Sequence, residues 1–167
     1  MKQSLIAIVC WILMLVTGAT AETKKIYTIL WEGCEHACQG YVDLITESGF
    51  DAEIILRDVD QDKSRLPGFI QEARDMDVDL VSTYGTSVTL GIAGTMDTMT
   101  ETRFINDIPL VFWYVSDPFG TGIAAGFDAS GRANITGTYN RVPEQVNINA
   151  IKNFLPEFQS LGMIYNS

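Results

Sequence analysis

The residues with the clearest capacity for binding chemistry form a turn at Tyr84-Gly85-Thr86-Ser87. A strand-like apolar stretch precedes this turn, and a helix-like stretch follows it. The first N–H groups of a helix lack partners within the helix and carry its positive dipole end. Together with the hydroxyls of Thr86 and Ser87, they predict a place that can hold a carboxylate or another small anion. The alternative is that Gly85 only permits a tight turn and that Thr86 or Ser87 only caps the helix.

Residue types that support catalysis do not form a recognisable set in this chain. His36 is the only histidine and no Gly-x-Ser-x-Gly elbow exists, so a Ser-His-Asp hydrolase is not expected. Asp117 could pair with Glu32 or Glu35 as two acids, but an Asp-Pro step after a strand is more typical of a turn. The Gly-rich segment 120–126 has the loose spacing of a dinucleotide fingerprint, yet it follows the fourth strand and lacks a completing acid. We therefore expect neither an enzyme nor a cofactor.

Cys34 and Cys38 flank the predicted start of a helix. In an oxidising compartment they can form a disulfide or remain two free thiols, and a helical spacing of four bridges poorly unless the first turn distorts. A metal site through His36 is disfavoured, because residues two apart point away from each other on a helix. The acidic run 58–62 lacks the Gly and the distal Glu of a calcium loop, so we interpret it as a solvated turn that caps a helix. No metal site is expected.

The N-terminus differs in composition from the rest of the chain. Lys2 precedes an apolar run, and the small residues that end at Ala21 are typical of a secretory cleavage site. We interpret residues 1–21 as a signal peptide, since a membrane anchor needs roughly 20 apolar residues. The mature protein is expected to be periplasmic or otherwise extracytoplasmic, with no direct membrane insertion. The formal net charge of −10 argues against nucleic acid and anionic lipid as partners.

The remainder of the chain alternates between strand-like and helix-like patterns. Strands are expected at 26–31, 52–57, 78–83, 109–115, 135–139 and 161–165. Helices are expected at 37–48, with Ala37, Tyr41, Leu44 and Ile45 on one face; around a buried stripe of Leu66, Phe69, Ile70 and Ala73; at 87–99; and at 143–154. This order predicts an α/β fold, a doubly wound, flavodoxin-like parallel sheet with helices on both faces.

Ligands of such sheets bind beyond the carboxyl ends of the strands. Here those ends are Trp31-Glu32, the segment 83–87 and Ser116-Asp117-Pro118. Aromatic residues are frequent near these ends, namely Trp31, Tyr84, Trp113 and Tyr114. Aromatic walls with a few fixed polar groups indicate a pocket for a small organic molecule.

Six segments, in order along the chain, resemble the extracytoplasmic solute-binding proteins of ABC transporters, especially the subgroup with tryptophan-binding lipoproteins. They are 25–31, 79–87, 108–112, 115–122, 134–137 and 161–166. The resemblance extends from about residue 24 to the last residue. It implies a type I periplasmic-binding fold with two lobes that close on a ligand, a membrane permease as partner, and no catalysis.

The resemblance also implies roles for individual residues. The turn at 84–87 would be the anion clamp of the first lobe, Ser116 and Asp117 would contact the polar end of the ligand, and 31–35 would form the rim of the cleft. The ligand-binding residues expected on this basis are Trp31, Glu32, Glu35, Tyr84, Gly85, Thr86, Ser87, Ser116 and Asp117. Asn140 and Arg141 would lie near the hinge.

Three departures from the family pattern accompany the resemblance. Members are usually about twice as long as a single domain of roughly 100–200 residues. Ser87 stands where relatives often have Pro or Ala, and Cys34 and Cys38 have no counterpart. We expect a signal peptide at 1–21, a first ligand-binding lobe at 22–140, and at 141–167 a hinge crossing with the start of an incomplete second lobe.

The expected function is capture of a small organic solute, an amino acid or a carboxylate-like compound, for an ABC permease. The alternative is an extracytoplasmic ligand-sensing module for a membrane signalling receptor.

Overall fold

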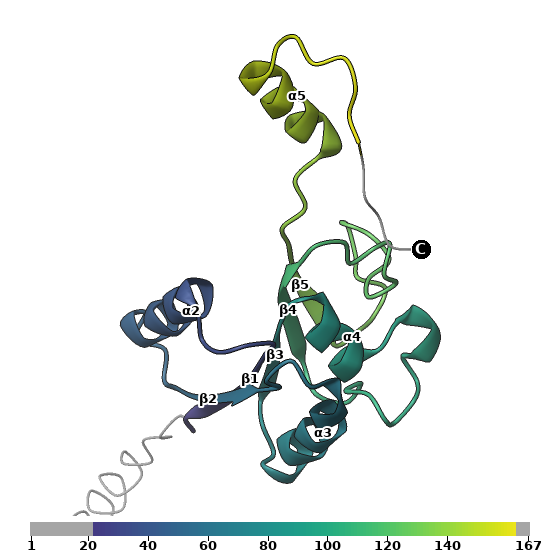
Figure 1. Cartoon of the computed structure of the whole chain (residues 1–167). Coiled ribbons are helices and arrows are strands. Elements are labelled where there is room, and N and C mark those ends of the chain that lie inside the picture. Colours follow the sequence, from purple (N-terminus) through teal and green to yellow (C-terminus); the bar gives the residue numbers. More distant parts are fainter. Residues whose placement is uncertain (1–21, 163–167) are drawn as a thin grey trace, which may run out of the picture.

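A computed structural model describes residues 22–162, which form a five-stranded parallel sheet in the order β2-β1-β3-β4-β5 (Figure 1). The strands are β1 (Lys24–Leu30), β2 (Ala52–Asp58), β3 (Leu80–Tyr84), β4 (Leu110–Val115) and β5 (Ile135–Tyr139). The helices are α2 (His36–Glu47), α3 (Leu66–Asp75), α4 (Thr86–Ala93) and α5 (Glu144–Phe154). The predicted doubly wound α/β fold is confirmed.

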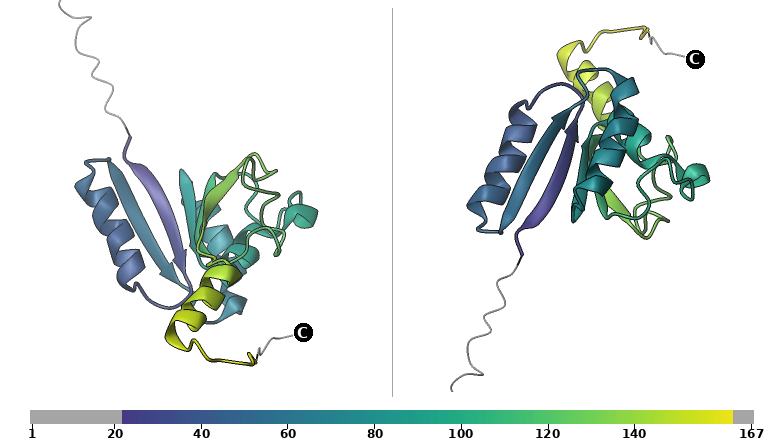
Figure 2. Two further views of the ribbon diagram at one scale, coloured as in Figure 1. Left: turned by 90° about the horizontal axis from the view of Figure 1, so that it is seen from above. Right: turned by 90° about the horizontal axis from the view of Figure 1, so that it is seen from below.

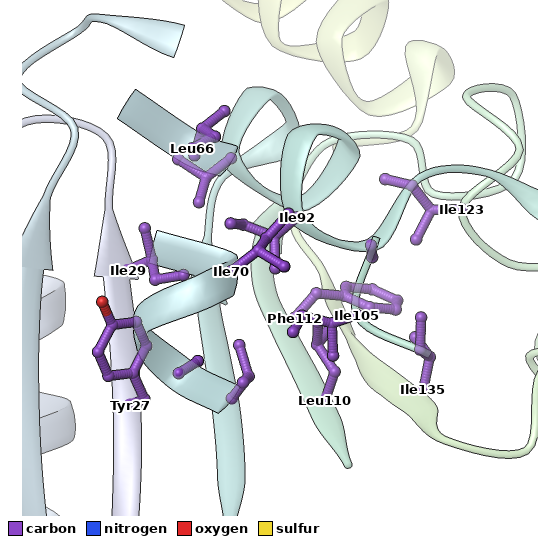
Figure 3. Close-up of a cluster of buried hydrophobic side chains, with 14 of the residues drawn as sticks. Tyr27, Ile29, Leu66, Ile70, Ile92, Ile105, Leu110, Phe112, Ile123 and Ile135 are labelled. Atoms are coloured by element: carbon purple, nitrogen blue, oxygen red, sulfur yellow. The ribbon is translucent and has the colours of Figure 1, made fainter. Parts of the chain in front are cut away.

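The hydrophobic core lies between one face of the sheet and the helices α3 and α4 (Figure 3). Strand side chains that alternate toward this face are buried, among them Tyr27, Ile29, Val81, Leu110 and Phe112. The helices contribute Leu66, Ile70, Ala73, Val88, Ile92 and Ala93. The buried stripe predicted for the helix between the second and third strands is confirmed, with its remaining member, Phe69, half-buried.

The opposite face of the sheet carries α2, which both views of Figure 2 place beside β2 and β1. Tyr41 of α2 stacks on Trp113 of β4, whose side chain points away from the core because successive side chains of a strand alternate. Cys38 is the one buried residue of this helix. On the apolar face predicted for α2, Tyr41 and Ile45 are half-buried, whereas Ala37 and Leu44 are exposed.

The helix predicted at 87–99 is shorter than expected. It covers Thr86–Ala93 and ends because Gly94 adopts a φ of 64°, after which a 3-10 turn follows at Met96–Thr98. Buried Arg132 donates from Nη2 to the Ala93 carbonyl over 2.5 Å and from Nη1 to the Gly94 carbonyl over 3.3 Å. A cation at this helix end satisfies carbonyl groups that the helix itself leaves unpaired.

The ends of the chain bear on two further predictions. The predicted signal peptide at 1–21 lies outside the described residues, and so does most of the predicted strand at 161–165, whose residues 161 and 162 are not in a strand. Helix α5 projects beyond the sheet and has no buried residue (Figure 1). No helix within 22–162 combines the length and the apolar character that crossing a membrane requires.

Candidate functional site

The carboxyl ends of β1, β3 and β4 lie at one edge of the sheet, where the strand order reverses direction between β1 and β3. A hollow of about 270 Å³ opens at this edge, and we call it the strand-end hollow. Its lining residues are Trp31, Tyr84, Gly85, Thr86, Ser87, Tyr114 and Ser116. The structure therefore brings together six of the nine residues that the sequence predicted for ligand binding.

The first turn of α4 forms the polar part of this hollow. Gly85 precedes the helix with a φ of 88°, a conformation that a side chain would strain, and its N–H donates to the Trp113 carbonyl over 2.9 Å. No side-chain hydrogen bond caps α4, and the Thr86 hydroxyl instead accepts the Ser116 N–H over 3.3 Å. Within residues 22–162, the N–H groups of Thr86 and Ser87 have no acceptor. The turn thus leaves donors open toward the hollow, as an anion-binding helix terminus does.

Trp31, Tyr84 and Tyr114 form the apolar wall of the strand-end hollow, and a row of stacked rings supports it. Tyr41 stacks on Trp113 at 5.0 Å, Trp113 contacts Tyr84 at 4.6 Å, and Tyr84 stacks on Tyr114 at 4.9 Å between ring centroids. Trp113 Nε1 donates to the Ser82 hydroxyl over 2.8 Å, which fixes the orientation of the indole ring. Tyr114 was predicted as aromatic surface but not as a site residue. Its position at the end of an apolar strand is the only sequence signal for that role.

A second hollow of about 550 Å³ adjoins the first, and Tyr84 and Tyr114 line both. We call it the rim hollow; its other lining residues are Cys34, Glu35, His36, Ala37 and Gln39. Burial raises the pKa of Tyr84, and the Tyr114 hydroxyl and the Glu35 carboxylate raise it further. Tyr84 therefore remains a neutral hydrogen-bonding phenol at physiological pH.

Cys34 and Cys38 form a disulfide at the rim hollow, with their Cα atoms 5.1 Å apart. Cys34 precedes the first residue of α2, so the pair does not have to satisfy helical spacing, and the expected distortion of the first turn is not needed. Among the described residues, no cluster of His, Cys, Asp and Glu is suited to hold a metal ion.

Three predicted ligand-binding residues lie outside the strand-end hollow. Glu35 lines the rim hollow, and exposed Glu32 lines neither. Asp117 accepts the Gly120 N–H over 2.9 Å and faces Arg141, with Asp117 Oδ2 and Arg141 Nη1 3.6 Å apart. The structure thus directs Asp117 toward its own turn and toward the connection between β5 and α5.

The predicted hinge residues lie in that connection. The Asn140 N–H donates to the Val115 carbonyl over 3.0 Å, and Arg141 also pairs with Glu144 in the first turn of α5. These contacts join the carboxyl edge of the sheet to α5.

Comparisons with known proteins place this geometry in context. A protein-family model described as "ABC transporter substrate binding protein" matches residues 32–167. A search of curated proteins finds no match.

Several solved structures are similar to the chain. An ABC domain in complex with L-Trp from Streptococcus pneumoniae has a TM-score of 0.67 and 21% identity, over 80% of this chain and 44% of that one. A ligand-free, open substrate-binding protein with adhesive properties from Clostridium difficile has a TM-score of 0.65 and 21% identity, over 80% and 44%. A leucine-binding protein from Thermotoga maritima has a TM-score of 0.52 and 19% identity, over 80% and 37%. The chain thus spans less than half the length of these solved proteins, and the likeness shows a shared fold.

Proposed function

Because the chain belongs to the family of ABC transporter substrate-binding proteins, we propose that it is the extracytoplasmic solute-binding component of an ABC-type transporter. In this proposal it captures a small organic solute, an amino acid or a related carboxylate, and delivers it to a membrane permease. The signal-peptide pattern at 1–21 supports an extracytoplasmic location.

The observation that carries the proposal is the composition of the strand-end hollow. It combines aromatic surface from Trp31, Tyr84 and Tyr114 with open donors from the first turn of α4. Small-molecule sites are typically apolar pockets with a few fixed polar groups. No Lys or Arg lines this hollow, so the N–H groups and the hydroxyls of Thr86, Ser87 and Ser116 are the donors available to a carboxylate.

Amino acids are the first compounds to test. The aromatic wall suits the apolar body of such a solute, and the α4 terminus suits its carboxylate. Among the similar structures, the Streptococcus pneumoniae protein is in complex with L-Trp and the Thermotoga maritima protein is a leucine-binding protein. The ligands named for these two proteins support amino acids as the first solutes to test on this chain.

The proposed division of the chain places the first ligand-binding lobe at 22–140 and the hinge at Asn140 and Arg141. The five strands lie within the proposed lobe, and Arg141 pairs with a residue on each side of the connection, Asp117 and Glu144. Residues 141–167 belong in this proposal to the crossing toward a second lobe that closes over the hollow.

A thermal-shift screen of the full chain with amino acids and small carboxylates tests the proposal. A solute at 100 times its Kd stabilises a folded protein by about 2.7 kcal/mol, which corresponds to a rise in Tm of roughly 5–10 °C at this size. Ser87→Ala removes one hydroxyl from the α4 turn and should reduce the shift caused by a carboxylate-bearing solute.

The matched control is Ser48→Ala at the other end of α2, where the hydroxyl donates to the Ile45 carbonyl away from either hollow. It should leave the ligand-induced shift unchanged. If none of the solutes raises the Tm, the proposed anion clamp is wrong. If Ser87→Ala and Ser48→Ala both respond like the wild type, the Ser87 hydroxyl is not part of the clamp.

A further inference from the structure

We propose that Tyr114 is a specificity-determining residue of the strand-end hollow, where its ring stacks on a flat, unsaturated group of the solute. This inference rests on the proposed solute-binding function and names the chemical class of the solute. The hydrophobic pattern of β4 does not explain the backbone conformation of Tyr114.

Tyr114 has a left-handed backbone conformation, with a φ of 59°. The other described non-glycine residues with positive φ, namely Asp60, Gln61 and Asp77, lie in turns outside the strands, whereas Tyr114 lies within β4. Residues with a Cβ seldom adopt this conformation, and Tyr lacks the short polar side chain that lets Asp and Asn tolerate it. Backbone strain of this kind persists where the surroundings impose it, and it is concentrated at functional sites.

The strain accompanies a β-bulge. β4 pairs with β5 through Phe112 with Gly137 and Val115 with Tyr139, so two residues of β4, Trp113 and Tyr114, lie opposite one residue of β5. Hydrogen bonds hold the strand on both sides of the bulge: the Trp113 carbonyl accepts the Gly85 N–H, and the Val115 carbonyl accepts the Asn140 N–H.

The bulge has a direct effect on the direction of the two aromatic side chains. In a regular strand, the rings of Trp113 and Tyr114 would point to opposite faces of the sheet. Here both rings contact Tyr84, and the Tyr114 ring lies at the carboxyl edge, where it lines both hollows. The strained residue is therefore the one that adds a ring to the site.

The remaining exposure of the Tyr114 ring indicates what it can receive. The residue is 53% exposed although its ring stacks on Tyr84 at 4.9 Å with an interplanar angle of 25°. The Tyr114 ring is the last in the row Tyr41, Trp113, Tyr84, Tyr114, and it lies at the strand-end hollow. Offset stacking favours a flat π system over a saturated group of equal size, and a saturated ring cannot lie as close to an aromatic face. The solute class that follows is a small carboxylate or amino acid with a flat, unsaturated group.

The test compares two solutes on the full chain, L-phenylalanine and L-cyclohexylalanine, which share a carbon skeleton and differ in the flatness of the ring. Binding is followed by tryptophan fluorescence, to which Trp31 and Trp113 contribute, excited where neither solute absorbs. The wild type should bind L-phenylalanine roughly three- to tenfold more tightly than L-cyclohexylalanine. Tyr114→Phe should keep that preference, whereas Tyr114→Gly should lose most of it with the Tm unchanged or higher, because Gly accepts the positive φ.

Two further variants keep the test decisive. Asn has no ring and tolerates a positive φ, so Tyr114→Asn replaces Tyr114→Gly if the Gly variant does not fold. Asp77→Gly relaxes a positive φ of 50° in the turn before β3 and should not alter the preference. Equal affinities in the wild type, or a preference that survives in Tyr114→Gly or Tyr114→Asn, would overturn the role of Tyr114 while the proposed function stands. If neither these two solutes nor any compound of the thermal-shift screen binds the wild type, the proposed function fails, and this inference fails with it.

Discussion

Helices α4 and α2 both begin at the edge of the sheet that carries the candidate site, but they are attached to the sheet in different ways. α4 has eight residues, of which Val88, Thr89, Ile92 and Ala93 are buried in the main core. α2 has twelve residues, of which Cys38 is buried. The side of the site formed by α4 is thus held by extensive packing.

The side formed by α2 depends on a few local interactions. The disulfide ties Cys38 to Cys34 in the preceding loop, and Tyr41 stacks on Trp113. Leu44, further along the helix, is 69% exposed. α4 is thus anchored through four buried residues, whereas α2 buries Cys38 alone and is tied near the rim by a covalent bond and an aromatic stack.

The largest expected effect is that of Ile92→Ala in α4. Ile92 is fully buried in the core cluster, and truncation of such a side chain removes apolar contacts and leaves a cavity. The free energy of unfolding should fall by about 3 kcal/mol, measured by chemical denaturation of the full chain. A loss below about 1 kcal/mol would mean that α4 is not the firmly packed side.

Reduction of the Cys34–Cys38 disulfide should have the next largest effect. The bridge closes a short loop, and its removal should lower the free energy of unfolding by about 2 kcal/mol on the chain-entropy account. Hydrogen exchange should become faster in the first turns of α2 and should change little in α4. Equal acceleration in both helices would contradict the proposed difference in attachment.

A smaller effect on the free energy of unfolding is expected from substitution of Glu72 in α3, which lies on the side of the sheet that carries the main core. Its carboxylate accepts hydrogen bonds from Arg57 and from the Tyr27 hydroxyl, which lower the pKa of Glu72, the Arg57 bond most. Because the pKa of Glu72 is lower in the folded than in the unfolded protein, the ionised carboxylate stabilises the fold at pH values above the ordinary pKa of a Glu. This contribution is lost as the pH falls through the folded-state pKa.

Glu72→Gln tests this pH dependence. The variant should lose no more than about 1 kcal/mol near neutral pH, because a third of the Glu72 side chain is exposed. Its stability should then decline less steeply than that of the wild type as the solution is acidified. Denaturation curves at a series of pH values measure both slopes, and parallel slopes would show that the network does not contribute.

The smallest expected effect is that of Leu44→Ala on α2. The side chain is largely exposed, so the free energy of unfolding should change by no more than about 0.5 kcal/mol. Chemical denaturation beside Ile92→Ala gives the direct comparison. Equal losses in the two variants would show that α2 is as firmly packed as α4.

Much of the fold follows from local patterns in the sequence. The five described strands begin and end within one or two residues of the predicted ranges, because buried parallel strands are marked by short apolar runs. The end predicted for α4, at residue 99, was wrong. Apolar residues continue past Ala93, so the hydrophobic pattern did not indicate that the helix ends at Gly94. Leu44 has a suitable position for a buried face, but burial depends on what packs against that face.

The candidate site, like the fold, was predicted from the sequence only in part. The sequence alone determined that the turn at Tyr84–Ser87 follows a central strand, and strand order then placed it near Trp31 and Ser116. Only the tertiary structure decided that Asp117 turns toward Arg141 and that Tyr114 enters the hollow. The physical reason is that hydrophobic periodicity specifies the elements and their buried faces, whereas the β4 bulge depends on pairing with β5, some twenty residues further along the chain.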